Sequence, residues 1–236
     1  MSNESASASL HRLGLAHRPV AVAFADHPPA GISVVSIPAV SSCAFWRRAE
    51  QEVFYATAEA HRGCAVGAHV MGLPLSAETR EELGGSVALM SGLGYLRGDE
   101  VANIPQVRAA GAGVIYGPLA DFPLQADCAL VWVEPAQAML LGEALQTTAW
   151  SASAPPRATL MGRPACGAMA QAINDGRESF SLGCAGMRAF TEVAPALALF
   201  VIPGEAIPGL SDRLAGSLAS NEAMLEHYRA KKNAFA

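Results

Sequence analysis

Short apolar runs bounded by prolines and glycines recur along the chain, and they predict the strands of a buried sheet. The first, Val20–Phe24, follows Pro19 and is stopped by a pair of prolines. Asp127–Val133 and Ala196–Ile202 show no alternation of polar residues, which is typical of strands covered on both faces. Ile32–Ile37 predicts one further strand.

Helical patterns fill much of the sequence between these runs. Two serines can cap a helix from Cys43 to Ala60, in which apolar residues recur at spacings of four, four and three. Shorter helices are predicted near Cys64 and over Ala77–Leu83. Pro135 begins another helix, because proline is favoured in a first turn, and a last one is predicted from Pro208 to Lys231.

This order of strands and helices predicts an α/β fold with a mixed sheet flanked by helices. Two strand-proline-helix units, which begin at Asp127 and Ala196, suggest two related α/β halves. Residues 1–9 are rich in serine and alanine without an apolar period, so we expect them to be frayed, and residues 10–236 to form a single domain. The many glycines between Gly84 and Gly117 predict loops and tight turns.

Composition narrows the function classes. The 236 residues include 16 Lys and Arg against 21 Asp and Glu, a net charge of −5, which argues against a basic nucleic-acid binder. Hydrophobic residues make up 51% and charged residues 16%, enough for a sizeable core and suggestive of a homodimer. No apolar run approaches the roughly 20 residues of a membrane helix. No secretory signal is recognisable either, so we expect a cytoplasmic protein without a membrane partner.

The cysteines are the main candidates for chemistry. A reducing compartment keeps thiols free, and the count of five is odd. Four of them lie beside glycines or predicted helix starts, where unpaired backbone N–H groups favour the thiolate by lowering the thiol pKa: Cys43, Cys64, Cys166 and Cys184. Cys128 lies in the middle of a predicted strand, and we interpret it as a core residue.

Several stretches resemble successive blocks of the domain-of-unknown-function 169 family, and together they span most of the chain. These stretches are Pro19–Phe24, Cys43–Ala49, Gly63–Gly67, Asp127–Met139, Gly162–Cys166 and Ser181–Arg188. The resemblance implies that the four cysteines named above occupy family cysteine positions, whereas the position of Cys128 is more usually aliphatic. Ala65 departs from the pattern, because many relatives have proline there. The family carries no assigned activity, so the resemblance implies no reaction.

The spacing of the four cysteines does not identify a metal site. They are separated by 21, 102 and 18 residues, unlike the paired motifs of zinc ribbons or the run of cysteines in ferredoxins. A [4Fe–4S] cluster can still be assembled from distant ligands, and four cysteines would imply electron transfer, whereas three would leave one iron open to a substrate. We predict Cys43, Cys64 and Cys184 as iron ligands, and Cys166 as a fourth ligand or a reactive thiol.

The sequence therefore favours an enzyme that uses an iron–sulfur cluster for redox or lyase chemistry on a small-molecule substrate. Arg188 is a candidate anion clamp, although a structural ion pair is an equal alternative. His61 and His69 flank Cys64 and are secondary candidates as ligands or proton donors, with core or surface roles as the alternatives. Tyr55 and Glu59, one predicted helical turn apart, are a candidate acid/base pair or a solvated face.

Two rival functions remain open at this stage. One is a non-catalytic protein that holds haem, a metal or another small ligand, although the sequence lacks the Cys-x-x-Cys-His motif of attached haem. The other is a zinc-stabilised domain. Nucleophile elbows, zinc-protease helices and Walker loops are absent from the sequence, so the familiar hydrolase and nucleotide-binding classes are disfavoured.

Overall fold

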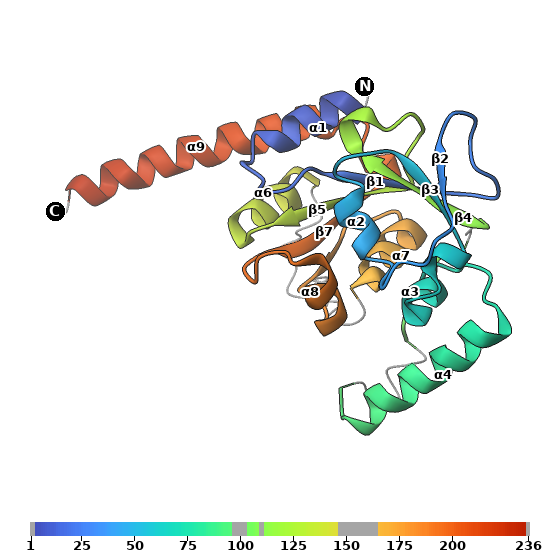
Figure 1. Cartoon of the computed structure of the whole chain (residues 1–236). Helices are drawn as coiled ribbons and strands as arrows, with labels where there is room; N and C mark the ends of the chain where they lie inside the picture. The colour runs from blue at the N-terminus through green and yellow to red at the C-terminus, as the bar shows by residue number, and fades with distance from the viewer. Residues whose placement is uncertain (1–2, 96–102, 109–110, 146–164, 235–236) are drawn as a thin grey trace.

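The structure is a computed structural model that describes residues 3–95, 103–108, 111–145 and 165–234. A seven-stranded mixed sheet with the order β2-β3-β4-β1-β5-β7-β6 runs through the molecule (Figure 1). All neighbouring strands are antiparallel except β2 and β3. The strands are β1 (Val20–Ala25), β2 (Ser33–Val35), β3 (Phe54–Thr57), β4 (Gly113–Pro118), β5 (Cys128–Val133), β6 (Ser179–Ser181) and β7 (Ala198–Pro203). The predicted α/β class with a mixed sheet is confirmed.

Helices cover both faces of the sheet. One face packs against α2 (Ala44–Arg48), α3 (Ala65–Val70), α7 (Cys166–Asp175) and α8 (Ala185–Thr191). The other face packs against α1 (Asn3–His11), α6 (Pro135–Leu145) and α9 (Leu210–Ala234). The long helix α4 (Ala77–Gly92) follows α3, and the short 3-10 helices are η1 (Glu59–His61), η2 (Leu119–Asp121) and η3 (Gly204–Ala206). Successive strand residues alternate between the two cores because side chains of a strand point to opposite faces.

The strand register reveals two related halves. Val20 of β1 pairs with Pro118 of β4, and Cys128 of β5 pairs with Pro203 of β7, so Val20 and Cys128 are equivalent positions. The same offset makes Ala21 equivalent to Ala129, and these two residues pair with each other between β1 and β5. A strand pair in which a residue faces its own equivalent has a local two-fold axis. The order β3-β4-β1 and its counterpart β6-β7-β5 are related by this pseudo-two-fold axis.

Turn hydrogen bonds repeat the same symmetry. After β4, the N–H of Leu119 donates to the carbonyl oxygen of Pro19 over 2.8 Å, and after β7 the N–H of Gly204 donates to that of Asp127 over the same distance. Each of these bonds opens a 3-10 helix directly after a strand-final proline. The prediction that the units beginning at Asp127 and Ala196 are the two related halves is nevertheless wrong. The strands of these units are β5 and β7, which are neighbours within one half. The local strand-proline-helix likeness does not follow the symmetry.

Three local predictions are wrong. The helix expected from Cys43 to Ala60 ends at Arg48, and Phe54–Thr57 is strand β3, because aromatic and β-branched side chains pair well with β4. Residues 3–9, expected to be frayed, lie in α1, where Leu10 is fully buried and Asn3 donates to two backbone carbonyls. Residues 113–118 were expected to form loops, but they form strand β4. Glycine is needed there because neighbouring side chains occupy the space of a Cβ, as Tyr55 does at Gly113.

The strands predicted at Val20–Phe24, Asp127–Val133 and Ala196–Ile202 are present within a few residues, as are the helices near Cys64 and after Pro135. Among the residues that the structure describes, no helix is both long and apolar enough to cross a membrane.

Candidate cysteine centre

The four predicted cysteines lie on helices of one face of the sheet. Cys43, Cys64 and Cys184 are the N-cap residues of α2, α3 and α8, and Cys166 is the first residue of α7. Helix α2 contacts α8, and α3 contacts α7, so each contact joins one half of the molecule to the other. These two contacts are equivalent under the pseudo-two-fold axis, which brings cysteine-bearing turns of both halves together.

Two of these thiols are held in the same way. The sulfur of Cys64 accepts the backbone N–H of Gly67 over 3.3 Å, and the sulfur of Cys184 accepts that of Met187 over 3.4 Å. The Cys43 sulfur instead lies 2.7 Å from the hydroxyl of Ser41. Hydrogen bonds of this kind fix the direction in which a sulfur atom points, and they stabilise negative charge on it.

Electrostatic interactions link all four sulfur atoms. Burial raises the pKa of Cys43 to about 12, the Ser41 hydrogen bond lowers it, and negative charge on Cys64 and Cys184 raises it. Burial also raises the pKa of Cys166, and Cys64, Cys184 and Cys43 raise it further. Thiols influence each other in this way only when they are close in space. These cysteines, which are far apart in the sequence, therefore lie in the same neighbourhood of the fold.

The protonation state differs from the sequence prediction. Helix starts and glycines were expected to lower the thiol pKa, but for Cys43 and Cys166 the burial effect is larger and the pKa rises. Both thiols lie in an apolar cluster that disfavours the charged form. These two residues are therefore neutral thiols in the protein as described, and they must lose protons before they bind a metal.

A buried hydroxyl without a partner lies beside Cys64. Ser42 is 2% exposed, and its Oγ makes no hydrogen bond in the structure. A Cβ built on Gly67 would lie 2.7 Å from that oxygen and 3.0 Å from the Cys64 sulfur. The missing side chain of Gly67 is therefore what allows the serine hydroxyl and the thiol to share this corner. A buried hydroxyl without a partner usually marks a place where a ligand or water completes the site.

A buried histidine–tyrosine pair lies next to the cysteines. His61 Nδ1 lies 2.8 Å from the carbonyl oxygen of Thr57, so this nitrogen carries the hydrogen. Burial lowers the pKa of His61 to about 4, so the ring is neutral and Nε2 accepts from the Tyr116 hydroxyl, 3.0 Å away. Burial raises the pKa of Tyr116, and negative charge on Cys128, Cys166 and Cys43 raises it further.

Sequence reasoning missed Tyr116 altogether. It lies in the glycine-rich run that was assigned to loops, whereas in the structure it is a fully buried residue of β4. Its ring stacks on Phe45 with the centroids 5.9 Å apart. The apolar residues around it are a strand signal, but only the register of β3 and β4 reveals that its hydroxyl meets His61.

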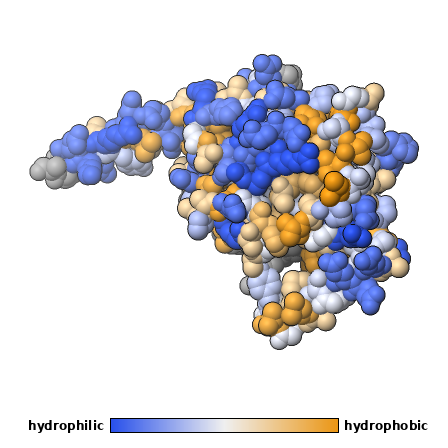
Figure 2. Space-filling view, in the orientation of Figure 1, coloured by the Kyte–Doolittle hydropathy of each residue, from blue (hydrophilic) through white to orange (hydrophobic). Residues whose placement is uncertain are grey.

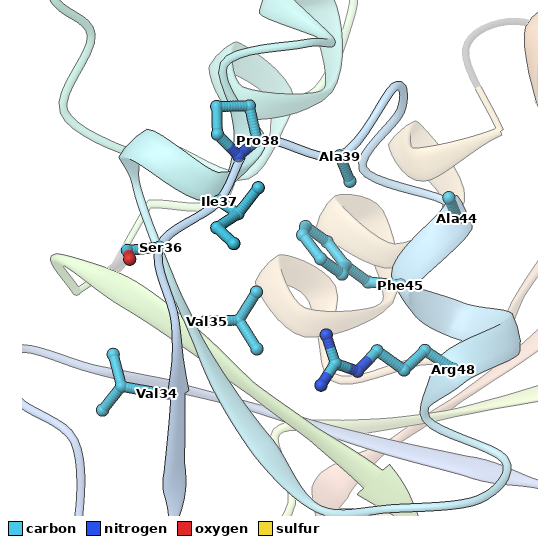
Figure 3. Close-up of a pocket in the computed structure, with 9 residues that line it drawn as sticks. All are labelled: Val34, Val35, Ser36, Ile37, Pro38, Ala39, Ala44, Phe45 and Arg48. Atoms are coloured by element: carbon cyan, nitrogen blue, oxygen red, sulfur yellow. The ribbon is translucent and has the colours of Figure 1, made fainter.

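A pocket of about 530 Å³ lies between the segment that follows β2 and helix α2 (Figure 3). Val35 and Ile37 extend into it from one side, and Phe45 and Arg48 of α2 from the other. Phe45 is two residues after Cys43. On the opposite wall the backbone oxygen of Ala39 would lie 2.0 Å from a Cβ at Gly63, so this wall packs directly against the residue before Cys64. The pocket therefore lies between segment 34–39, which packs against Gly63, and α2, of which Cys43 is the N-cap residue.

The structure also shows where the other residues singled out in the sequence lie. Arg188 donates to the backbone oxygens of Ala194, Leu182 and Leu197, so its guanidinium anchors the turns around Cys184. Its predicted role as an anion clamp remains a prediction. Tyr55 lies on β3 and Glu59 in η1, so they do not share a helix face. Cys128 is fully buried in β5, which confirms its assignment to the core.

Among the described residues, no group of three or more His, Cys, Asp or Glu side chains is arranged to hold a metal ion. A single zinc ion would bring thiolate sulfurs to within about 3.8 Å of one another, given Zn–S bonds of about 2.3 Å. Binding of one ion by all these cysteines would therefore require their helices to move.

A comparison with known protein families assigns this α/β chain to one family. The sequence profile of the domain-of-unknown-function family DUF169, described as uncharacterised ArCR, matches residues 11–213 of the 236. The chain belongs to this family, as its cysteine-containing blocks predicted. The comparisons with curated proteins and with solved structures found no match.

Proposed function

We propose that this protein binds an iron–sulfur cluster at the cysteine centre and uses it for redox or lyase chemistry on a small molecule. Cys43, Cys64 and Cys184 are the ligands, and Cys166 is a fourth ligand or a reactive thiol. The observation that carries the proposal is that the four cysteines stand at the N-terminal ends of four helices from both halves of the molecule, in which α2 contacts α8 and α3 contacts α7.

The residues at the centre fit such a group. Thiolates are the usual ligands of iron–sulfur clusters, and backbone N–H groups that donate to sulfur stabilise them. Gly67 and Met187 donate N–H groups to Cys64 and Cys184. Within the described part of the chain the buried Ser42 hydroxyl has no hydrogen-bond partner, so we expect it to donate to a sulfur atom. Gly67 also leaves open the space that a side chain would fill.

A cluster requires a wider spacing of the thiolates than one zinc ion does. In a cluster each thiolate binds a different iron, so the sulfur atoms stand further apart than around a single ion. When bound, a cluster with three cysteine ligands supplies an open iron for a substrate, whereas four ligands supply electron transfer.

The chain's own residues exclude water and bind the substrate. Phe45 separates the pocket from the buried pair of His61 and Tyr116, since its ring packs edge-on to the histidine and stacks on the tyrosine. The mainly apolar lining suits a small, weakly polar molecule, with Arg48 as the charged group at its edge. Arg48 is engaged by Glu52 at 2.6 Å, which keeps the guanidinium in place beside the pocket.

We also infer a cytoplasmic setting. All five cysteines are free thiols, and the proposed centre requires four of them to stay reduced. Reducing compartments maintain that state, whereas oxidising ones favour disulfides.

The test is the iron and sulfide content of protein prepared without oxygen. The wild type is expected to hold about four of each per chain, with broad absorbance near 400 nm that bleaches on reduction. Cys64→Ser should lose most of both. Cys128→Ala, which removes a core thiol outside the centre, should keep both and serves as the matched control.

Each other outcome identifies a different function. A sharp Soret band would assign a haem-binding protein, and bound zinc without iron would assign a zinc-stabilised domain. A protein that holds no metal after anaerobic preparation and reconstitution with iron and sulfide would overturn the proposal. So would a Cys64→Ser variant that retains the full content of iron and sulfide.

A further inference from the structure

The last helix leaves the body of the protein. The first part of α9 packs against α1 and α6, whereas its C-terminal part projects alone into solvent (Figure 1). Of the side chains described there, those from residue 222 onward are all exposed. A helix of this length without tertiary contacts is marginal in water, because packing supplies most helical stability in proteins. Packing against a partner would therefore stabilise the projecting part of α9.

The apolar face of α9 continues from the packed part into the free part. Leu210 and Leu214 are fully buried, and Leu218 packs beside them. The same face then carries Asn221, Leu225 and Tyr228, which follow Leu218 at spacings of three, four and three, so that one polar residue lies between the packed and the free apolar residues. Leu225 and Tyr228 are 39% and 57% exposed. In Figure 2 the projecting helix is otherwise largely hydrophilic.

Charges along the free part are segregated. Glu222 and Glu226 come first, and Arg229, Lys231 and Lys232 follow. In the single chain Arg229 already donates to Glu222 over 3.0 Å, so these two side chains lie along the same side of the helix. An antiparallel copy of the same helix would set the acidic part of each helix against the basic part of the other. A parallel copy would set like charges side by side.

We propose that α9 pairs antiparallel with α9 of a second copy of this chain. In the register that buries the apolar face, Leu225 packs against Tyr228 of the second copy, and Glu222 faces Arg229 of the second copy, with both contacts repeated by symmetry. This surface is separate from the cysteine centre, which lies on the opposite face of the sheet. Dimer formation therefore does not depend on the proposed cluster.

Sedimentation equilibrium of the full chain from about 1 to 100 µM tests the pairing. The wild type should dimerise, and Leu225→Glu with Tyr228→Glu should be monomeric across this range. The matched control is Ala223→Glu with Ala230→Glu, which adds the same charges to the other side of the helix and should leave the dimer intact. Circular dichroism establishes that each variant is folded.

Charge reversal tests the antiparallel register. Glu222→Arg should weaken the dimer about tenfold, because it faces Arg229 of the second copy, and adding Arg229→Glu should restore the affinity. A wild type that stays monomeric at 100 µM would overturn the proposal, as would a dimer that survives both glutamate substitutions. A monomer that sediments with anionic phospholipid vesicles would also overturn it, by assigning this face to a membrane surface.

Discussion

Cys64 and Cys184 hold equivalent places in the two halves of the molecule. Each caps the short helix that follows an outer strand of its half, and each accepts a backbone N–H three residues further along the chain. We therefore expect Cys184→Ser to lose iron and sulfide to the same extent as Cys64→Ser. Anaerobic metal analysis of both variants checks this, and an intact content in only one of them would show that the halves contribute unequally.

The role of Cys166 is separable from that of Cys43. If Cys166 is a reactive thiol, Cys166→Ser should keep iron and sulfide and lose turnover, whereas a fourth ligand would lose both. Cys43→Ser should lose the cluster in either case. Electron paramagnetic resonance of the reduced Cys166→Ser protein distinguishes the two roles. An unchanged cluster signal indicates a reactive thiol, whereas a lost or altered signal indicates a ligand.

Gly67→Ala should damage the centre without unfolding the protein. The new Cβ would press on the Ser42 hydroxyl and the Cys64 sulfur, so we expect lower iron content and a stability loss of about 1–3 kcal/mol. The matched control is Gly84→Ala in α4, where the added methyl meets nothing within 4 Å. That substitution should stabilise the helix by about 0.5–1 kcal/mol. Thermal unfolding with metal analysis compares the two variants.

Tyr116→Phe should cost about 1–3 kcal/mol, because it leaves the buried Nε2 of His61 without a donor. Tyr228→Phe removes a hydroxyl from an exposed position and should change the unfolding free energy little. Urea unfolding, at protein concentrations low enough for the chain to be monomeric, measures the unfolding free energy of both variants. Equal effects of the two substitutions would contradict the buried hydrogen bond.

Stability should fall as the pH drops from about 6.5 to about 4. His61 has a pKa of about 4 when folded and an ordinary value of 6.5, so between these values the unfolded chain binds a proton that the folded chain does not. Its contribution is complete above pH 6.5, and about 3 kcal/mol is lost as the pH falls to 4. His61→Gln should flatten this part of the stability curve, whereas the exposed His227→Gln should not.

Several elements could be predicted because their signals are local. Val20–Phe24 and Asp127–Val133 are continuous apolar runs typical of buried strands, and Pro135 as the first residue of α6 is a helix-start signal that needs no tertiary partner. Segment 43–60 was mistaken because its apolar residues fit a helical period, while pairing with β4 decided that Phe54–Thr57 is a strand. Tyr116 was missed for the same reason, since a hydroxyl in a glycine-rich run gives no sign of its partner.

The sequence by itself determined the α/β class, the family and the cysteines to follow, because these depend on residue types and on patterns within short windows. Only the tertiary structure decided that those cysteines begin helices that contact one another on one face of the sheet. This arrangement depends on the pairing of Ala21 with Ala129 and on the contacts of α2 with α8 and of α3 with α7. The tertiary structure also reversed the expected pKa shifts at Cys43 and Cys166, because desolvation depends on the surrounding atoms, and most of those come from distant parts of the chain.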